Sequence, residues 1–236
     1  MTMDRRKFLA LGGLSLSAML LEACNAKGEK AIPLLRWAER RNEGVERGVI
    51  FREGSRDAPD SERLAGESMP AYHISRQVPV WDAAARGAWT LEVAGAVKRP
   101  LRLSLDDLAR LPRVTQRVNH YCVEGWTAVT EFTGVRVSTL ARLAGLRPDA
   151  AYVDFESFDR GYHESWDLES AVHAQSLIAY AREGKPLSAR YGAPARLHAP
   201  IKLGYKNVKY LTRVVFLPHR NGGYWSDRGY EWFAGT

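Results

Sequence analysis

The sequence predicts an α+β fold weighted toward sheet, in a single compact domain over residues 71–236. Short apolar segments that alternate like strands are separated by short helical segments, without the regular strand–helix rhythm of a parallel sheet. The chain has 236 residues, of which 45% are hydrophobic and 10% aromatic, enough for one sizeable core. We expect an export signal at residues 1–24 and a tether or surface segment at residues 25–70 before this domain.

The N-terminal residues have the pattern of an export signal. A charged start precedes an apolar run that is short for a membrane-spanning helix. The Arg5-Arg6 pair resembles the twin-arginine signature, which addresses already folded proteins for export. Leu21 to Cys24 resembles a bacterial lipobox, in which Cys24 becomes lipid-anchored, and the alternative is simple cleavage after Ala26. Either outcome predicts a periplasmic protein or one on the outside face of a bacterial membrane.

Residues 25–70 are charged, contain several glycines and lack sustained periodicity. A short helix over Arg36–Arg41 is the one regular element that we expect there. Most of this stretch is therefore interpreted as a tether or a surface wrap.

The first half of the domain contains two strands and two helices with clear start and stop signals. Residues 89–94 and 114–120 alternate like half-buried strands. Ser104 caps a helix over residues 105–111 that Pro112 ends, and Ser138 starts a second helix that Gly145 stops.

The second half adds further strand candidates around one helical turn. Residues 152–155 form a strand, and Asp167 caps a turn that extends to Val172. The remaining strand candidates are residues 177–181, 195–199 and 210–217.

The charge and cysteine content exclude several classes of protein. The formal net charge is +7, but the basic residues are spread along the chain and alternate with acids, so we expect no nucleic-acid partner. An anionic ligand explains the excess of cations equally well. Only Cys24 and Cys122 are present, which excludes a disulfide scaffold and a zinc site built from several thiolates.

Cys122 lies at the end of a predicted strand, and Gly125 allows the chain to turn tightly after it. Strand ends beside turns are positions where rigid scaffolds present reactive groups. A thiolate suits a polarizable metal or nucleophilic chemistry. The alternative is a lone cysteine packed as a small hydrophobic residue.

A second segment places several cations around Gly204, namely Arg196, Lys202, Lys206 and Lys209. Such a loop offers positive charge and approachable backbone N–H groups to a phosphate. A solvated basic hairpin is the alternative, and the loop by itself favours neither.

Three motifs together resemble the oxidoreductase molybdopterin-binding domain family, whose fold is of the sulfite-oxidase-like type. They are Cys-Val-Glu-Gly-Trp at 122–126, Gly-Ala-Pro-Ala-Arg-Leu at 192–197 and Lys-Leu-Gly-Tyr-Lys-Asn-Val-Lys at 202–209. Family members include bacterial periplasmic methionine-sulfoxide reductases. The resemblance covers residues 69–215.

The resemblance implies a molybdenum-molybdopterin cofactor and a set of residues that hold it. Cys122 matches the cysteine that ligates the metal, beside the two dithiolene sulfurs of the pterin. Tyr191 is a further candidate, at a position where the reductases have asparagine. The cofactor-binding positions implied by the motifs are His73, Arg76, Cys122, Ser157, Arg196, Asn207, Val208 and Lys209.

The implied activity is oxygen-atom transfer at sulfur, and the residues around Cys122 favour one direction. Glu124 places an acid two residues after the ligand, which disfavours a doubly charged anion and favours a neutral substrate such as methionine sulfoxide. We therefore assign Cys122 and Glu124 as catalytic, with His120, Tyr121 and Trp126 as candidates for tuning the metal. Sulfite oxidation and a metal-free, lipid-anchored binding protein on the same fold remain alternatives.

Electrons must then come from a separate protein. No Cys-x-x-Cys-His motif occurs, so we expect no covalent haem. In the reductases of this family the partner is a haem-bearing membrane protein. The chain ends at Thr236 without the immunoglobulin-like dimerisation domain of eukaryotic-type sulfite oxidases, so we expect a monomer.

Overall fold

A computed structural model describes residues 32–50 and 55–236, and the chain divides near residue 50 into two compact units. In the first unit, helix α2 (Ile32–Val45) continues into the π-helical turn η1 (Glu46–Ile50). This helix is longer than the short one expected over Arg36–Arg41. Within the two described ranges, no helix is both long and apolar enough to span a membrane. The predicted export signal and lipobox lie outside the described residues.

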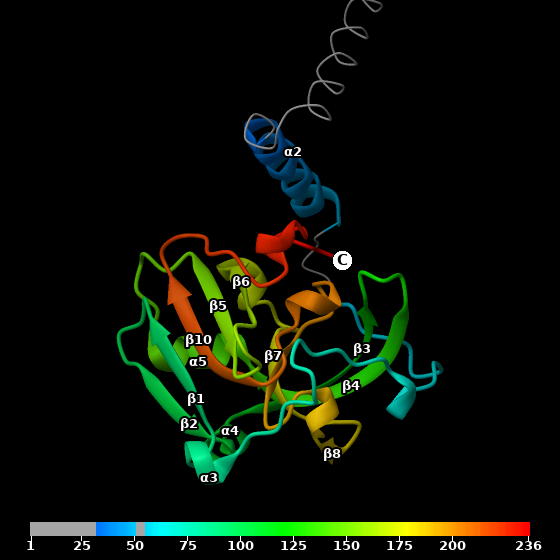
Figure 1. Cartoon of the computed structure of the whole chain (residues 1–236), viewed down its shortest axis with the longest axis vertical. Coiled ribbons are helices and arrows are strands. Elements are labelled where there is room, and N and C mark those ends of the chain that lie inside the picture. Colours follow the sequence, from blue (N-terminus) through cyan, green and yellow to red (C-terminus); the bar gives the residue numbers. More distant parts are fainter. Residues whose placement is uncertain (1–31, 51–54) are drawn as a thin grey trace, which may run out of the picture. The chain divides into compact units, whose positions relative to one another are not determined.

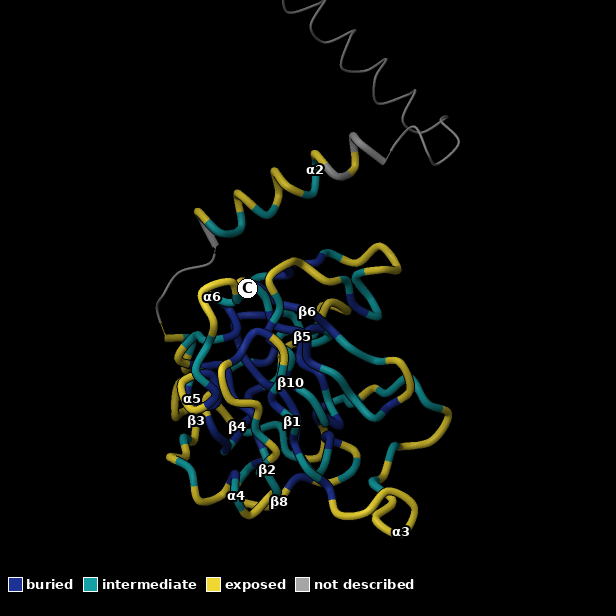
Figure 2. The backbone as a smooth tube through the Cα atoms, turned by 90° about the vertical axis from the view of Figure 1, so that its left-hand side faces the viewer, coloured by how far each residue is buried: buried dark blue, intermediate teal, exposed yellow. Residues whose placement is uncertain are grey.

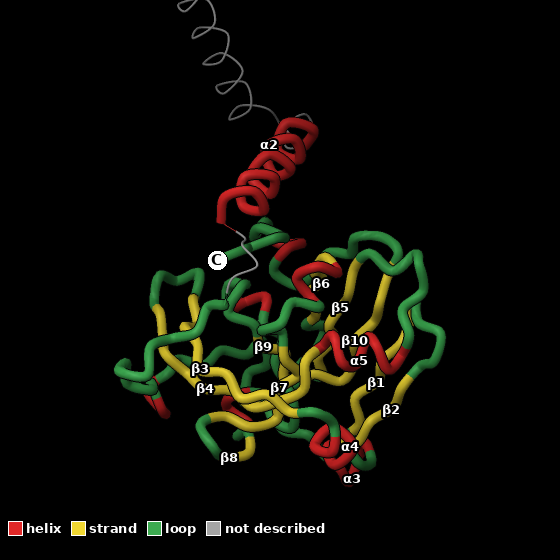
Figure 3. Tube along the Cα trace, turned by 180° about the vertical axis from the view of Figure 1, so that it is seen from behind, coloured by secondary structure: helices red, strands yellow, loops and turns green. Residues whose placement is uncertain are grey.

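The second unit is built on two sheets. The first has the strand order β2-β1-β10-β5-β6, and every neighbouring pair is antiparallel except β1 with β10. Figures 1 and 3 show this sheet on one side of the unit and the hairpin of β3 and β4 on the other. The strands of the first sheet are β1 (Thr90–Gly95), β2 (Leu101–Ser104), β5 (Tyr152–Ser157), β6 (His163–Asp167) and β10 (Leu211–Leu217).

The second sheet has the order β3-β4-β7-β8, with β9 also paired to β7. All its described pairings are antiparallel. Its strands are β3 (Arg113–Tyr121), β4 (Thr127–Arg136), β7 (Leu177–Arg182), β8 (Lys185–Pro186) and β9 (Arg196–His198).

Short helices connect the strands, so the predicted sheet-weighted α+β domain is confirmed. The α-helices of this unit are α3 (Ala83–Arg86), α4 (Leu105–Arg110), α5 (Val137–Ala144) and α6 (Leu168–Ala171). The 3-10 turns are η2 (Gly66–Ser68), η3 (Ala189–Tyr191), η4 (Gly204–Lys206) and η5 (Ser226–Arg228).

Local signals predicted α4 and α6 well and α5 less well. Ser104 and Asp107 form a capping box at the start of α4, and the Asp167 side chain accepts from the backbone N–H of Ser170 in α6. Helix α5 starts at Val137, one residue before the expected Ser138. Its N-cap residue Arg136 makes no side-chain hydrogen bond, so no capping signal marks this start in the sequence.

The longest strand, β4, was not among the sequence predictions. Gly134 lies inside it, and a glycine within a strand weakens the pattern by which a strand is predicted. The structure supplies the reason for this glycine. A Cβ atom there would lie 2.1 Å from the carbonyl oxygen of Ile178 in β7, so the two strands approach too closely for any side chain.

The main core joins the first sheet to helices α4 and α5. It contains strand residues Val93, Phe155 and Phe216 and helix residues Leu108 and Leu140, all fully buried. Figure 2 shows these buried stretches running through the middle of the unit beneath exposed loops. Each fully buried side chain of this size stabilises the fold by roughly 1.5–3 kcal/mol. The strands that lead to the site are therefore anchored in a well-packed core.

Residues 55–70, expected to form a tether or a surface segment, lie along β3 and β4. Ala58 donates from its backbone N–H to Arg117 (2.9 Å), and Ala65 donates to Val129 (2.8 Å). Ala58 and Met69 are buried. This segment leads the chain directly into the wall of the cavity described next.

Candidate active site

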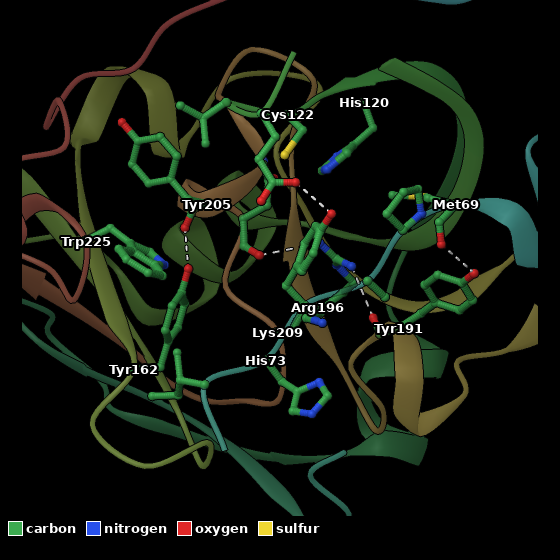
Figure 4. A pocket seen from close by; sticks show the side chains of 18 of the residues that line it. Met69, His73, His120, Cys122, Tyr162, Tyr191, Arg196, Tyr205, Lys209 and Trp225 are labelled. Carbon is green, nitrogen blue, oxygen red and sulfur yellow. Dashed lines mark hydrogen bonds between the residues drawn. The ribbon is translucent and has the colours of Figure 1, made fainter. Parts of the chain in front are cut away.

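A cavity of about 360 Å³ opens where the two sheets meet. Residues that are distant in the sequence form its walls, as Figure 4 shows. They come from the extended segment 69–74, the turn after β3, the loop between β5 and β6, the stretch from η3 to β10, and the C-terminal residues Trp225 and Tyr230.

Cys122 occupies the first position of a tight turn after β3. Its backbone N–H donates to the carbonyl of Trp126 (3.0 Å), and its own carbonyl accepts from Gly125 (3.0 Å). Gly125 has a φ of 85°, which a glycine adopts without steric cost. The half-buried thiol lines the cavity (Figure 4). Burial raises the pKa of the Cys122 thiol, and a metal cation bound there would instead favour the thiolate.

Among the described residues, Cys122 does not belong to a cluster of metal-ligating side chains. In the described part of the chain, no group of three or more His, Cys, Asp or Glu side chains could hold a metal ion. A metal bound to this thiol would therefore take its other ligands from a non-protein group, which agrees with the dithiolene ligands that the sequence resemblance implies.

Two aromatic side chains hold the carboxylate of Glu124 at the cavity. The Tyr72 hydroxyl donates to Glu124 Oε2 (2.7 Å), and the Trp126 indole N–H donates to the same oxygen (3.3 Å). Tyr72 comes from the extended segment that precedes α3, so this contact joins two separate walls of the cavity.

Arg196 and Lys209 bring positive charge into the cavity, and neither forms a direct ion pair with a described carboxylate. The buried Arg196 guanidinium donates only to backbone carbonyls, at Leu197 (3.2 Å), Tyr191 (3.1 Å) and Asn207 (3.4 Å). Lys209 is half-buried, and its ammonium donates to the Arg190 carbonyl (3.4 Å). Neither cation is ion-paired with a carboxylate anywhere in the described ranges.

Burial is the main cause of the lowered pKa values of these two groups, and neighbouring cations add to it. Burial, with a contribution from Arg182, lowers the pKa of Arg196 to about 10. Burial and the nearby Arg196 lower the pKa of Lys209 to about 7. A buried charge without a counter-ion is costly, so an anion in the cavity would satisfy both groups. The pair fits the phosphate end of a pterin cofactor.

Asn207 shapes the same wall through its side chain. Its carboxamide accepts from the backbone N–H of Ala199 (2.6 Å) and donates to the carbonyls of Lys202 (3.0 Å) and Leu203 (3.2 Å). These bonds fix the loop that joins β9 to η4, and the Asn207 carbonyl accepts from Arg196.

Lys202 and Lys206 do not face solvent, so the interpretation as a solvated basic hairpin is wrong. Lys206 forms an ion pair with Glu164 (2.7 Å) in which both side chains are fully buried. Lys202 donates to the Phe233 carbonyl (2.7 Å) and lies 3.6 Å from Asp167. Tertiary structure thus divides the four cations of the loop into two structural lysines and the two cations that reach the cavity.

The other predicted cofactor residues have different surroundings. His73 and Tyr191 line the cavity, and the Tyr191 hydroxyl donates to the Met69 carbonyl (3.1 Å). Arg76, Ser157 and Val208 do not line the cavity: Arg76 is exposed, Val208 is packed in the core, and the Ser157 hydroxyl accepts from Asp159. The roles of these residues remain predictions.

Several residues at the cavity were not predicted as site residues, although Tyr205 lies within one of the family motifs. The Asp159 carboxylate accepts from the backbone N–H groups of Ile74 (2.9 Å) and Ser75 (3.1 Å) and so ties the extended segment to the β5–β6 loop. Tyr205, Trp225 and Tyr230 form an aromatic wall, with neighbouring ring centroids 5.0–5.3 Å apart. Residues this distant in the sequence come together only through the tertiary fold.

Comparisons with known proteins agree with the sequence resemblance. A family model described as the oxidoreductase molybdopterin-binding domain matches residues 75–225. A protein of Azospira oryzae with the provisional name protein-methionine-sulfoxide reductase subunit YedZ1 is 37% identical, covering 98% of this chain and 88% of its own length.

A catalytic subunit of the protein-methionine-sulfoxide reductase MsrP, from Gluconobacter oxydans, is 33% identical over 58% of this chain, which spans about half of that subunit. Among solved structures, the sulfane dehydrogenase SoxCD of Paracoccus pantotrophus matches with a TM-score of 0.53 and 26% identity. The match covers 56% of this chain and 38% of that one.

Proposed function

This chain belongs to the oxidoreductase molybdopterin-binding domain family, and on that basis we propose that it reduces sulfoxides such as methionine sulfoxide. It is an oxidoreductase, and its family implies a molybdenum-pterin cofactor. One observation supports the finer proposal most strongly: the Cys122 thiol lines the same cavity as two cations that form no ion pair with a described carboxylate.

The chain's own residues would hold the cofactor at its two ends. Cys122 would ligate the molybdenum, and Arg196 with Lys209 would bind the anionic end of the pterin through charge-assisted hydrogen bonds. When bound, the cofactor supplies two-electron redox chemistry and exchange of an oxygen atom with the substrate. The backbone around Asn207 shapes the wall beside Arg196.

The substrate side of the cavity suits an uncharged sulfur compound. The Glu124 carboxylate repels a sulfite dianion but tolerates a neutral sulfoxide. Trp126, Tyr205 and Trp225 add aromatic surface, against which a methionine side chain packs favourably. The names of the reductase relatives also support reduction of a sulfoxide as the direction of the reaction.

The net reaction needs electrons and protons from outside the chain. Reduction of a sulfoxide to a thioether consumes two electrons and two protons and releases the sulfoxide oxygen as water. We propose that a separate, haem-bearing membrane protein supplies the electrons. We further propose that the Arg5-Arg6 signal exports the folded, monomeric protein and that Cys24 anchors it by lipid, with cleavage after Ala26 as the alternative.

Elemental analysis combined with turnover tests this proposal. Protein from a molybdenum-competent host should contain molybdenum and should oxidise a reduced artificial donor with methionine sulfoxide as the acceptor. The Cys122→Ala variant is the matched control. Oxidation of sulfite without sulfoxide reduction would establish the sulfite-oxidase alternative, and protein free of molybdenum and pterin would favour the binding-protein alternative.

A further inference from the structure

Two histidines from different strands meet beside the Cys122 turn. His120 lies near the end of β3, His198 ends β9, and both are buried. His120 Nδ1 lies 3.3 Å from His198 Nε2, and the ring centroids are 5.4 Å apart with an interplanar angle of 29°. At this separation the rings meet edge to edge, so one N–H···N hydrogen bond joins them.

The outer nitrogens of the pair differ in their surroundings. His198 Nδ1 is buried without a hydrogen-bond partner, and its ring packs on Phe132 with centroids 4.1 Å apart. His120 lines the cavity, and Figure 4 shows its ring beside the Cys122 thiol. A Cβ atom on Gly204 would lie 2.8 Å from His120 Nε2. Because residue 204 is a glycine, no side chain covers this nitrogen on that side of the cavity.

A single proton lies in the contact between the two rings. His198 is fully buried and has no carboxylate partner among the described residues, so its charged form is disfavoured and one of its ring nitrogens stays unprotonated. Whichever ring accepts at the contact must carry its own proton on its outer nitrogen. In a neutral imidazole one nitrogen donates and the other accepts. Two arrangements are therefore possible, and they differ in which ring donates.

The surroundings of His198 decide between the two arrangements. If His120 donated, His198 would carry its proton on Nδ1, as a buried N–H without an acceptor. If His198 donates from Nε2, its Nδ1 keeps a lone pair, which the positive potential of Arg182 and Arg196 favours. An unpaired buried N–H is the rarer and more costly defect, so His198 is the donor.

We propose that His198 fixes the tautomer of His120, so that His120 presents an Nε2–H donor to the cavity beside Cys122. His198 acts as a positioning residue, and His120 donates to an oxygen or sulfur acceptor of the bound ligand. The identity of that ligand rests on the proposed function, whereas the tautomer does not. Such hydrogen bonds beside a metal ligand orient and tune the site.

Nitrogen NMR of the full-length protein labelled with 15N-histidine tests the tautomer directly. The chain has six histidines, and the His120 signals are those lost in the His120→Gln variant. We expect protonated Nε2 and unprotonated Nδ1 in His120. In His198→Phe, whose side chain cannot donate a hydrogen bond, both tautomers of His120 should be populated. In His198→Gln, whose amide can donate, the wild-type pattern should return.

A second readout uses the molybdenum-loaded protein. The Mo(V) paramagnetic signal should change in His198→Phe and stay close to wild type in His198→Gln. A proton on His120 Nδ1 in the wild type would overturn the proposal, as would a His120 pattern that His198→Phe leaves unchanged. Because the NMR measurement needs neither metal nor turnover, its failure is distinguishable from a failure of the proposed function.

Discussion

The Lys206 ammonium lies 2.7 Å from the Glu164 carboxylate, and neither side chain is exposed to solvent. Glu164 also accepts from the backbone N–H of Trp225 (2.9 Å) and from the Ser226 hydroxyl (2.9 Å). This buried ion pair therefore joins the η4 loop to the C-terminal segment that supplies Trp225 to the cavity wall.

We expect Lys206→Met to destabilise the protein strongly. Removing one partner leaves the Glu164 charge buried and uncompensated, which typically costs about 3–5 kcal/mol. The free energy of unfolding from urea denaturation measures this effect. The double variant Lys206→Met/Glu164→Gln should recover part of the loss. A single variant as stable as the wild type would show that the ion pair does not hold the loop in place.

Cys122→Ser separates a metal ligand from a packing residue. Serine cannot reproduce the charge and covalency of a thiolate, so we expect the variant to lose sulfoxide turnover and to show an altered Mo(V) signal. Much of the molybdenum should remain, because the pterin has its own contacts. A cysteine that only packs would instead lose about 1–2 kcal/mol of stability and keep its activity per folded molecule.

Alanine at Arg196 or Lys209 should lower the molybdenum and pterin contents together. Both changes remove charge-assisted contacts from the cavity. Because the buried Arg196 also donates to three backbone carbonyls, urea denaturation should confirm that its variant is folded. Lys185→Ala, at an exposed lysine in β8, is the matched control and should bind the cofactor normally. Full cofactor occupancy in the Arg196→Ala/Lys209→Ala double variant would contradict the anion site.

The stability of the cofactor-free protein should rise with pH above about 7. Burial lowers the pKa of Lys209 to about 7 from 10.5, so between these values the unfolded chain binds a proton that the folded chain has released. Stability then increases with pH by up to about 1.4 kcal/mol per unit. Denaturation at several pH values measures the slope.

The matched variant for this pH dependence is Lys209→Met. It removes the titrating group, so its stability should rise less steeply between pH 7 and 10 than that of the wild type. Parallel curves for the two proteins would show that Lys209 keeps an ordinary pKa and that its burial does not disfavour the charged form.

Replacing Arg5 and Arg6 by lysine should trap folded precursor in the cytoplasm. The twin-arginine route requires the arginine pair, whereas an ordinary secretory signal tolerates lysine. Cell fractionation with an antibody to the protein gives the distribution. Normal export of the lysine variant would exclude the twin-arginine route.

The sequence by itself determined the family, the fold class and the metal-ligand candidate. Cys122 and Gly125 carry a local motif, and Ser104 and Asp167 cap helices within a few residues of themselves. Such features can be predicted from the sequence because the interacting groups are neighbours in the chain. The strand that ends at Tyr121 was equally predictable from its alternation.

Only the tertiary structure decided why two cations of the basic loop reach the cavity and the other two do not. The family resemblance singled out Arg196 and Lys209, but nothing in the local sequence predicted the roles of Lys202 and Lys206. Glu164 and Asp167 neutralise the two middle lysines from β6, and no carboxylate pairs with the two outer cations in the described ranges. The charge of a side chain is fixed by its chemistry, but its counter-ion is fixed by the residues that the fold brings beside it.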